Sequence, residues 1–215
     1  MEEYSEKMKA ELALIAKELD ELDAQREKML VVTREITRRA REAIFALHHG
    51  DLGKAGTELE RARELIKELY ELKQTHPQLY YSGGVLNAQT EYVEASLLAS
   101  LLAGEGLPGF EELLVEPQAY LAGLGDLVGE LRRYVLNILR EGMVDKAWSI
   151  LEFMEEIYVE LGKFSYPEAL VPGLRHKVDV ARVILENTRN DVLFFERSRD
   201  LAQRIERLLE AMKGR

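Results

Sequence analysis

The stretch VVTREITRRAREAIFALHHGD, residues 31–51, decides the fold class, because it closes a segment from Tyr4 to His49 without proline or glycine. Apolar side chains in this segment fall on one face of a helix. They recur at intervals of three, four or seven residues: Leu12, Ile15, Leu19, Leu22, Met29, Ile36, Ala40, Ala43 and Leu47. At 1.5 Å per residue, such a helix is about 65 to 70 Å long, which exceeds the width of a compact domain of this size. We therefore expect the helix to contact other copies of the chain.

Turn residues divide the remaining chain into further helices. Gly50 and Asp51 end the first helix and cap the second, and segments with proline and glycine form the later loops. These loops are THPQLYYSGGV, AGEGLPGFEE and FSYPEALVPG, residues 75–85, 103–112 and 164–173. The helices predicted between them cover residues 52–74, 85–102, 117–140, 146–163 and 174–212. No segment alternates with the period of two that a strand needs. The sequence thus predicts an all-α fold of six to seven antiparallel helices in a single domain, residues 1–215.

Composition excludes several classes of protein. The 215 residues include no cysteine, which rules out disulfides and thiol catalysis and disfavours a structural zinc site. The charged N-terminus is unlike a signal peptide, and no apolar run approaches the roughly 20 residues of a membrane span. We therefore expect a cytoplasmic protein that does not enter a membrane. The formal charge of −10 disfavours non-specific binding to nucleic acid, unless the basic residues gather on one face.

Two helical segments carry pairs of acidic residues among apolar ones. NAQTEYVEAS, residues 87–96, places Glu91 and Glu94 three apart, and GLGDLVGELRR, residues 123–133, places Asp126 and Glu130 four apart. Each pair lies on one helix face, so the four carboxylates would converge if the two helices are antiparallel neighbours. Clustered carboxylates repel one another unless protons or cations neutralise them. Oxygen ligands without cysteine favour Mg²⁺, with Mn²⁺ as the alternative. The competing interpretation is that each acid faces solvent.

Basic residues are concentrated near the end of the first helix. Between Arg26 and Arg41 lie six basic and two acidic residues, a local charge of +4. A stripe along this helix could follow the phosphates of a nucleic acid. The candidate nucleic-acid-binding residues are Arg34, Thr37, Arg38, Arg41 and His48, together with Arg133 after the second acidic pair. A solvated face laced with salt bridges is the alternative.

Four segments together resemble the translin superfamily, which comprises translin and translin-associated factor X. They are VVTREITRRAREAIFALHHGD, LNAQTEYVEAS, YLAGLGDLVGELRR and LRHKVDVARV. The acidic motifs are similar to those of the factor X branch, and the chain is identified as a compact prokaryotic-type member. The resemblance implies a Mg²⁺-dependent endoribonuclease that acts inside a homo-octamer and binds RNA, with single-stranded DNA as a further partner. It implies Glu91, Glu94 and Asp126 as metal and catalytic carboxylates and Glu130 as a fourth catalytic candidate.

Three other functions remain open at the level of sequence. Translin itself binds nucleic acid without the acidic set, so the chain could be a binding scaffold without catalysis. All-helical nucleoside-triphosphate pyrophosphatases also use paired acids on neighbouring helices, although with a different second motif. A structural coiled-coil adaptor would bind no RNA.

Overall fold

The computed structural model describes residues 2–213 and, within them, seven helices and no strand. The helices are α1 (Glu2–His48), α2 (Leu52–Thr75), α3 (Pro77–Tyr80), α4 (Gly83–Ala103), α5 (Pro117–Arg140), α6 (Val144–Gly162) and α7 (Leu174–Lys213). The predicted all-helical fold with very long first and last helices is confirmed. One predicted loop differs, because α3 forms inside residues 75–85, where Pro77 starts a short helix that buries Leu79 and Tyr80.

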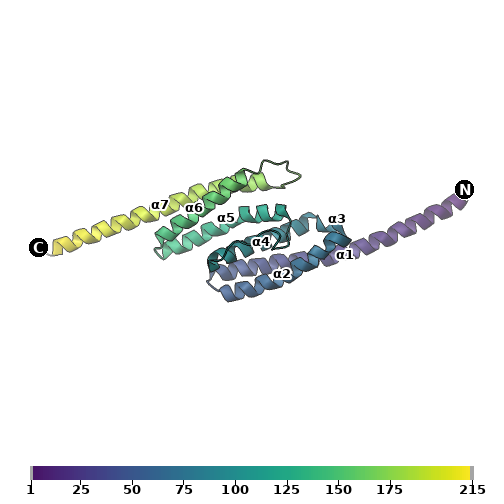
Figure 1. Cartoon of the computed structure of the whole chain (residues 1–215), viewed down its shortest axis with the longest axis horizontal. Coiled ribbons are helices and arrows are strands. Elements are labelled where there is room, and N and C mark those ends of the chain that lie inside the picture. Colours follow the sequence, from purple (N-terminus) through teal and green to yellow (C-terminus); the bar gives the residue numbers. More distant parts are fainter. Residues whose placement is uncertain (1, 214–215) are drawn as a thin grey trace.

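The helices form a row in the order α1, α4, α5 and α7, with α2 covering α1 and α6 covering α7 (Figure 1). All four helices of the row run in the same direction. Figure 1 shows this direction, and contacts along α4 and α5 confirm it for that pair, since Gln89 lies beside Glu116 and Val93 beside Gly123. The expected antiparallel packing of sequence neighbours therefore holds for α1 with α2 but not for α4 with α5.

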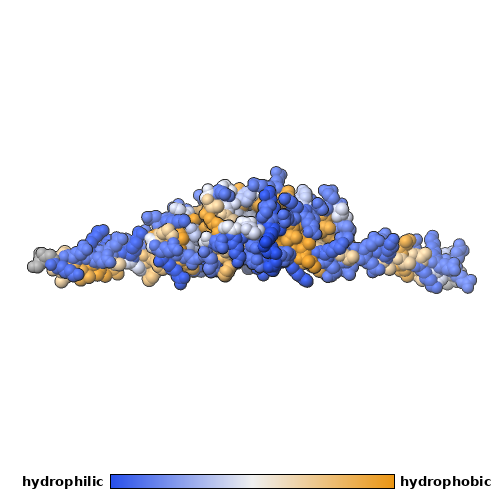
Figure 2. Space-filling view, turned by 90° about the horizontal axis from the view of Figure 1, so that it is seen from below, coloured by the Kyte–Doolittle hydropathy of each residue, from blue (hydrophilic) through white to orange (hydrophobic). Residues whose placement is uncertain are grey.

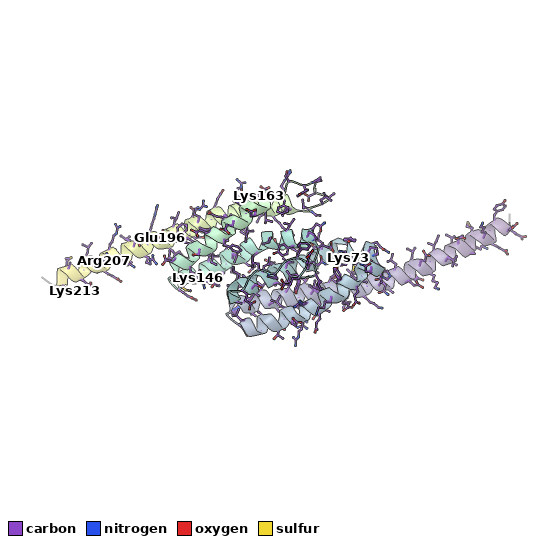
Figure 3. All side chains as sticks on the ribbon, in the orientation of Figure 1. Lys73, Lys146, Lys163, Glu196, Arg207 and Lys213 are labelled. Atoms are coloured by element: carbon purple, nitrogen blue, oxygen red, sulfur yellow. The ribbon has the colours of Figure 1, made fainter. Side chains whose placement is uncertain are left out.

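A returning segment, residues 104–116, explains the parallel pair. It leaves the end of α4 and runs back to the first half of the same helix before α5 begins. Glu116 fixes its end, accepting hydrogen bonds from Tyr80 Oη at 2.9 Å and from Lys73 Nζ at 2.7 Å. Gln89 Oε1 accepts a bond from the backbone N–H of Glu116. Lys73 marks this corner, where α2 meets α3 (Figure 3). The start of α5 is thus attached to α2, α3 and α4 at once.

Gly123 lets α4 and α5 approach each other closely. A Cβ atom at this position would lie 2.5 Å from Val93 Cγ1 and 3.0 Å from the carbonyl oxygen of Thr90. A side chain here would therefore force the two helices apart. Because α4 and α5 carry the two acidic pairs, this contact also sets how closely those pairs meet.

We expect Gly123→Ala to lower the free energy of unfolding by about 1–3 kcal/mol, since the added methyl group overpacks the helix contact. Denaturant unfolding followed by circular dichroism measures this change. Gly56→Ala is a matched control in the interior of α2, where an added Cβ meets nothing within 4 Å. That control should be stabilising by about 0.5–1 kcal/mol, because alanine favours a helix. Equal effects of the two substitutions would contradict the close approach.

The hydrophobic core ends well before the two long helices do. Buried apolar residues join α1 to α7 in one cluster, and they begin at Met29 in α1 and end at Val192 in α7. Residues 2–23, the N-terminal arm, and residues 193–213, the C-terminal arm, contain no buried residue. The arms project from opposite ends of the body (Figure 1). No helix within residues 2–213 is long and apolar enough to cross a bilayer.

Candidate functional site

The parallel arrangement of α4 and α5 brings the two acidic pairs together around Glu94. Burial, followed by the negative charges of Asp126, Glu130 and Glu91, raises the pKa of Glu94 from 4.5 to about 8. This carboxyl group makes no hydrogen bond or ion pair with the residues that the structure describes. Glu94 thus lies within the electrostatic influence of the other three acids, although the helices that carry the two pairs are parallel.

A basic side chain from outside the cluster binds each of the other three acids. Arg41 of α1 binds Glu91 through two nitrogens, with Nη2–Oε1 at 2.7 Å and Nε–Oε2 at 3.2 Å. Lys177 of α7 donates to both oxygens of Asp126, at 2.5 and 2.6 Å. His48, at the end of α1, is bonded to Glu130. Basic side chains from α1 and α7 thus reach the acids, and Glu94 alone has no basic partner within residues 2–213.

Carboxylate oxygens are ligands that suit Mg²⁺ or Mn²⁺, and the charges of three acids act on Glu94 here. In the conformation described, however, no three histidine, aspartate or glutamate side chains among residues 2–213 stand at metal-ligand spacing. In the same conformation Arg41 and Lys177 each hold one acid of the cluster in an ion pair. The donor set therefore fits a hard divalent cation, provided that Glu91 and Asp126 exchange their basic partners for it.

A basic groove lies next to the acids, on the exposed side of α1. Its volume is about 630 Å³ and it is lined by Thr33, Arg34, Thr37, Arg38, Arg41, Glu42, Phe45, Lys54, Gly84 and Asn87. Arg38 is bound to Glu35 and Glu42, which offsets its charge. Arg34 and Lys54 form no ion pair with residues 2–213. Arg41 belongs to both features, since it lines the groove and binds Glu91.

Four of the six predicted nucleic-acid-binding residues line this groove: Arg34, Thr37, Arg38 and Arg41. The other two do not. The side chain of His48 is only 1% exposed and holds Glu130, so it lies with the acids and not on the binding surface. Arg133 lies on α5, where its Nη1 is 4.0 Å from Glu130.

Sequence reasoning missed two cations. Lys177 lies inside the segment LRHKVDVARV, but a single lysine in the first turn of a helix carries no periodic signal. Lys54, at the start of α2, enters the groove because the tight turn at Gly50 folds α2 back along α1. No pattern in the sequence pointed to either residue.

A sequence model of the Translin family matches residues 24–188. The chain belongs to the translin family. An uncharacterised family relative from Methanocaldococcus jannaschii is 33% identical over 200 residues, covering 92% of this chain and 88% of that protein. Translin-associated protein X of Mus musculus is 23% identical over 181 residues, covering 66% of this chain and 62% of that protein.

Solved structures place the translin family member among proteins of the same fold. A structure of AfC3PO in complex with duplex RNA has a TM-score of 0.80 at 38% identity and covers 87% of this chain and 97% of that chain. The apo form of NeC3PO has a TM-score of 0.78 at 23% identity, with coverage of 86% and 96%. At 23% identity, the similarity to NeC3PO shows a shared fold and nothing further.

Proposed function

We propose that this translin family member is a Mg²⁺-dependent endoribonuclease that cleaves short or single-stranded RNA. The observation that carries the proposal is the buried Glu94, on which the charges of three further acids act, beside an open basic groove. A cluster of acids next to a surface for phosphate is the arrangement that metal-assisted phosphodiester cleavage requires. Mn²⁺ is the alternative metal.

The groove supports RNA as the substrate. Cations along α1 can hold a sugar–phosphate backbone without reading bases, and Arg34 and Lys54 have no acidic partner within residues 2–213 that would have to be displaced. AfC3PO, at 38% identity, has been solved with duplex RNA. Single-stranded DNA presents the same phosphates and is a second candidate partner.

The residues of the site would have two roles: the acids would bind the metal and position a water molecule, and the arginines would bind RNA. Glu91, Glu94 and Asp126 would hold the divalent cation, which when bound lowers the pKa of a water molecule and neutralises charge on the scissile phosphate. Glu130, oriented by the buried His48, would position that water. Arg34, Arg38, Arg41 and Arg133 would hold the RNA backbone against the acids.

Assembly is part of the proposal. A homo-octamer that encloses the grooves would place basic surface inside an outer surface that is acidic, consistent with the net charge of −10. We place this assembly in the cytoplasm.

The deciding experiment is an assay of end-labelled single-stranded RNA with Mg²⁺ or with EDTA. We expect cleavage only with the metal, and restoration when Mg²⁺ or Mn²⁺ is added back after EDTA. A parallel incubation with nucleoside triphosphates should release no pyrophosphate. RNA that remains intact under all metal conditions, at protein concentrations that saturate binding, would contradict the nuclease.

A binding scaffold without catalysis is the second candidate. Arg41 and Lys177 favour it, because they already neutralise Glu91 and Asp126 without a metal. This function requires RNA binding that weakens with salt and is the same in Mg²⁺ and in EDTA. Titrating labelled RNA by fluorescence anisotropy in both solutions separates the two candidates.

A further inference from the structure

Arg41 takes part in both the basic groove and the acidic cluster. Its side chain lines the groove, and its guanidinium binds Glu91 through Nη2–Oε1 at 2.7 Å and Nε–Oε2 at 3.2 Å. The hydrogen bond and charge of Glu91, followed by the charge of Glu94, raise the pKa of Arg41. Arg41 therefore neutralises part of the negative charge of α4, as a cation bound between these acids would.

The ion pair between Arg41 and Glu91 lies at the surface. The side chain of Arg41 is 68% exposed and that of Glu91 is 27% exposed. Figure 2, which views the molecule from the side of α2, shows hydrophilic side chains over much of the body, so water reaches the charged groups on that side. An ion pair this exposed adds little net stability, because water competes for both charges. A second anion can therefore take Arg41 from Glu91 at small cost.

Lys177 holds Asp126 in a different way. Its Nζ donates to both oxygens of Asp126, but its side chain is only 26% exposed and is not part of the groove lining. A Cβ atom at Gly125 would lie 3.0 Å from Lys177 Cβ, so the lysine packs against the backbone of α5. Of these two ion pairs, the one made by Arg41 is thus the one that an anion in the groove can break.

A phosphate in the groove is a strong competitor for Arg41. The planar guanidinium binds two oxygens of a phosphate as readily as two oxygens of a carboxylate. Arg34 and Lys54 line the same groove and form no ion pair within residues 2–213. A phosphodiester chain is therefore held by several cations at once, whereas Glu91 offers Arg41 a single carboxylate.

We infer that nucleic acid in the groove draws Arg41 away from Glu91 and so releases Glu91 to the acidic cluster, a step that rests on the proposed function of the groove. In the free protein the ion pair with Arg41 occupies Glu91. When a phosphate replaces Glu91 as the partner of Arg41, Glu91 becomes available as a ligand beside Glu94. RNA and a divalent cation then bind cooperatively, because both favour the state in which Arg41 has left Glu91.

RNA binding in EDTA tests the exchange without a metal. Glu91→Gln removes the carboxylate that competes for Arg41, so it should tighten the binding of a labelled single-stranded RNA about threefold or more. In an Arg41→Met background the same substitution should give a smaller gain. Asp126→Asn is the matched control, since it also removes one acid of the cluster but frees Lys177, which lies outside the groove. Fluorescence anisotropy measures each dissociation constant.

The size of these gains decides between an exchange and a general effect of charge. The gain from Asp126→Asn should match the small gain from Glu91→Gln in the Arg41→Met background. An equal gain from Glu91→Gln with and without Arg41 would overturn the exchange. Urea unfolding of the same variants without RNA is the structural control, because a purely structural role of Arg41 would lower stability and leave the two gains equal.

Mn²⁺ binding gives a second readout, measured from the electron paramagnetic resonance signal of free Mn²⁺. Arg41→Met should bind Mn²⁺ about fivefold or more tightly than the wild type in the absence of RNA, because Glu91 is already free. With saturating RNA, checked for integrity on a gel, this advantage should disappear, since RNA has removed Arg41 from Glu91 in the wild type as well. Lys177→Met should keep its advantage in both states. An advantage of Arg41→Met that is unchanged by RNA would overturn the exchange.

RNA binding in EDTA requires no cleavage, so the exchange of Arg41 is tested even if the protein is a scaffold without catalysis. RNA binding that is unaffected by Glu91→Gln would overturn the exchange and leave the nuclease standing. Absence of RNA binding in every variant would overturn the groove itself, and with it both proposals.

Discussion

Asp126→Ala is expected to abolish Mg²⁺-dependent RNA cleavage, with a fall in rate of about a thousandfold or more, because it removes an acid that would hold the metal. Glu91→Ala should have the same effect from the other helix. Neither acid lies in the basic groove, so RNA binding in EDTA should persist. The rate is measured with end-labelled RNA at saturating protein.

Controls separate catalysis from folding in this prediction. Asp126 also pairs with Lys177, and its loss leaves that lysine without its acid. Lys177→Met breaks the same ion pair but keeps the carboxylate, and it should retain Mg²⁺-dependent cleavage. Asp145→Ala, in the exposed first turn of α6, should change nothing. Undiminished cleavage in both Asp126→Ala and Glu91→Ala would remove the proposed site.

Glu94→Gln is expected to flatten the pH dependence of stability in the metal-free protein. Folding raises the pKa of Glu94 from 4.5 to about 8, so the folded state favours the protonated carboxyl group. Its contribution to stability is complete below pH 4.5 and is lost as the pH rises from 4.5 to 8. Because a tenfold change in proton affinity corresponds to about 1.4 kcal/mol, the loss is on the order of 5 kcal/mol.

Glutamine imitates the protonated acid at every pH. The variant should therefore match the wild type near pH 4.5 and be more stable by a few kcal/mol at about pH 8.5, as measured by urea unfolding in EDTA. Glu105→Gln, an exposed residue after α4, is the control for loss of one charge. Adding Mg²⁺ at the higher pH should stabilise the wild type more than Glu94→Gln, because the metal requires the ionised form. Parallel pH profiles of the wild type and Glu94→Gln would show that Glu94 is not held in a shielded acidic cluster.

Local signals accounted for most of the helices. Gly50 and Asp51 located the first turn, and Pro117 and Gly173 marked where α5 and α7 start. Residues 75–85 differed, because burial of Leu79 and Tyr80 stabilises a helical turn that glycine and proline alone do not predict. Neighbouring residues thus determine where most of the helices end. The short helix within residues 75–85 is the exception, because it depends on burial of its side chains.

The candidate site was predicted only in part. The spacing of Glu91 and Glu94, and of Asp126 and Glu130, is a local property, and it predicts that each pair lies on one helix face. Their basic partners come from α1 and α7, so they depend on packing between segments far apart in the chain. His48 shows the same limit, since only the position of Glu130 makes it a buried partner.

The returning segment, residues 104–116, sets the direction of α5 relative to α4. The residues of the two helices themselves do not set it. Shortening it to a tight hairpin would turn α5 end for end against α4, even with every residue of both helices unchanged. Asp126 and Glu130 would then meet α4 in reversed order, and Gly123 would no longer face Val93. The length of a loop that carries none of the four acids therefore decides which carboxyl groups of α4 and α5 lie close to one another.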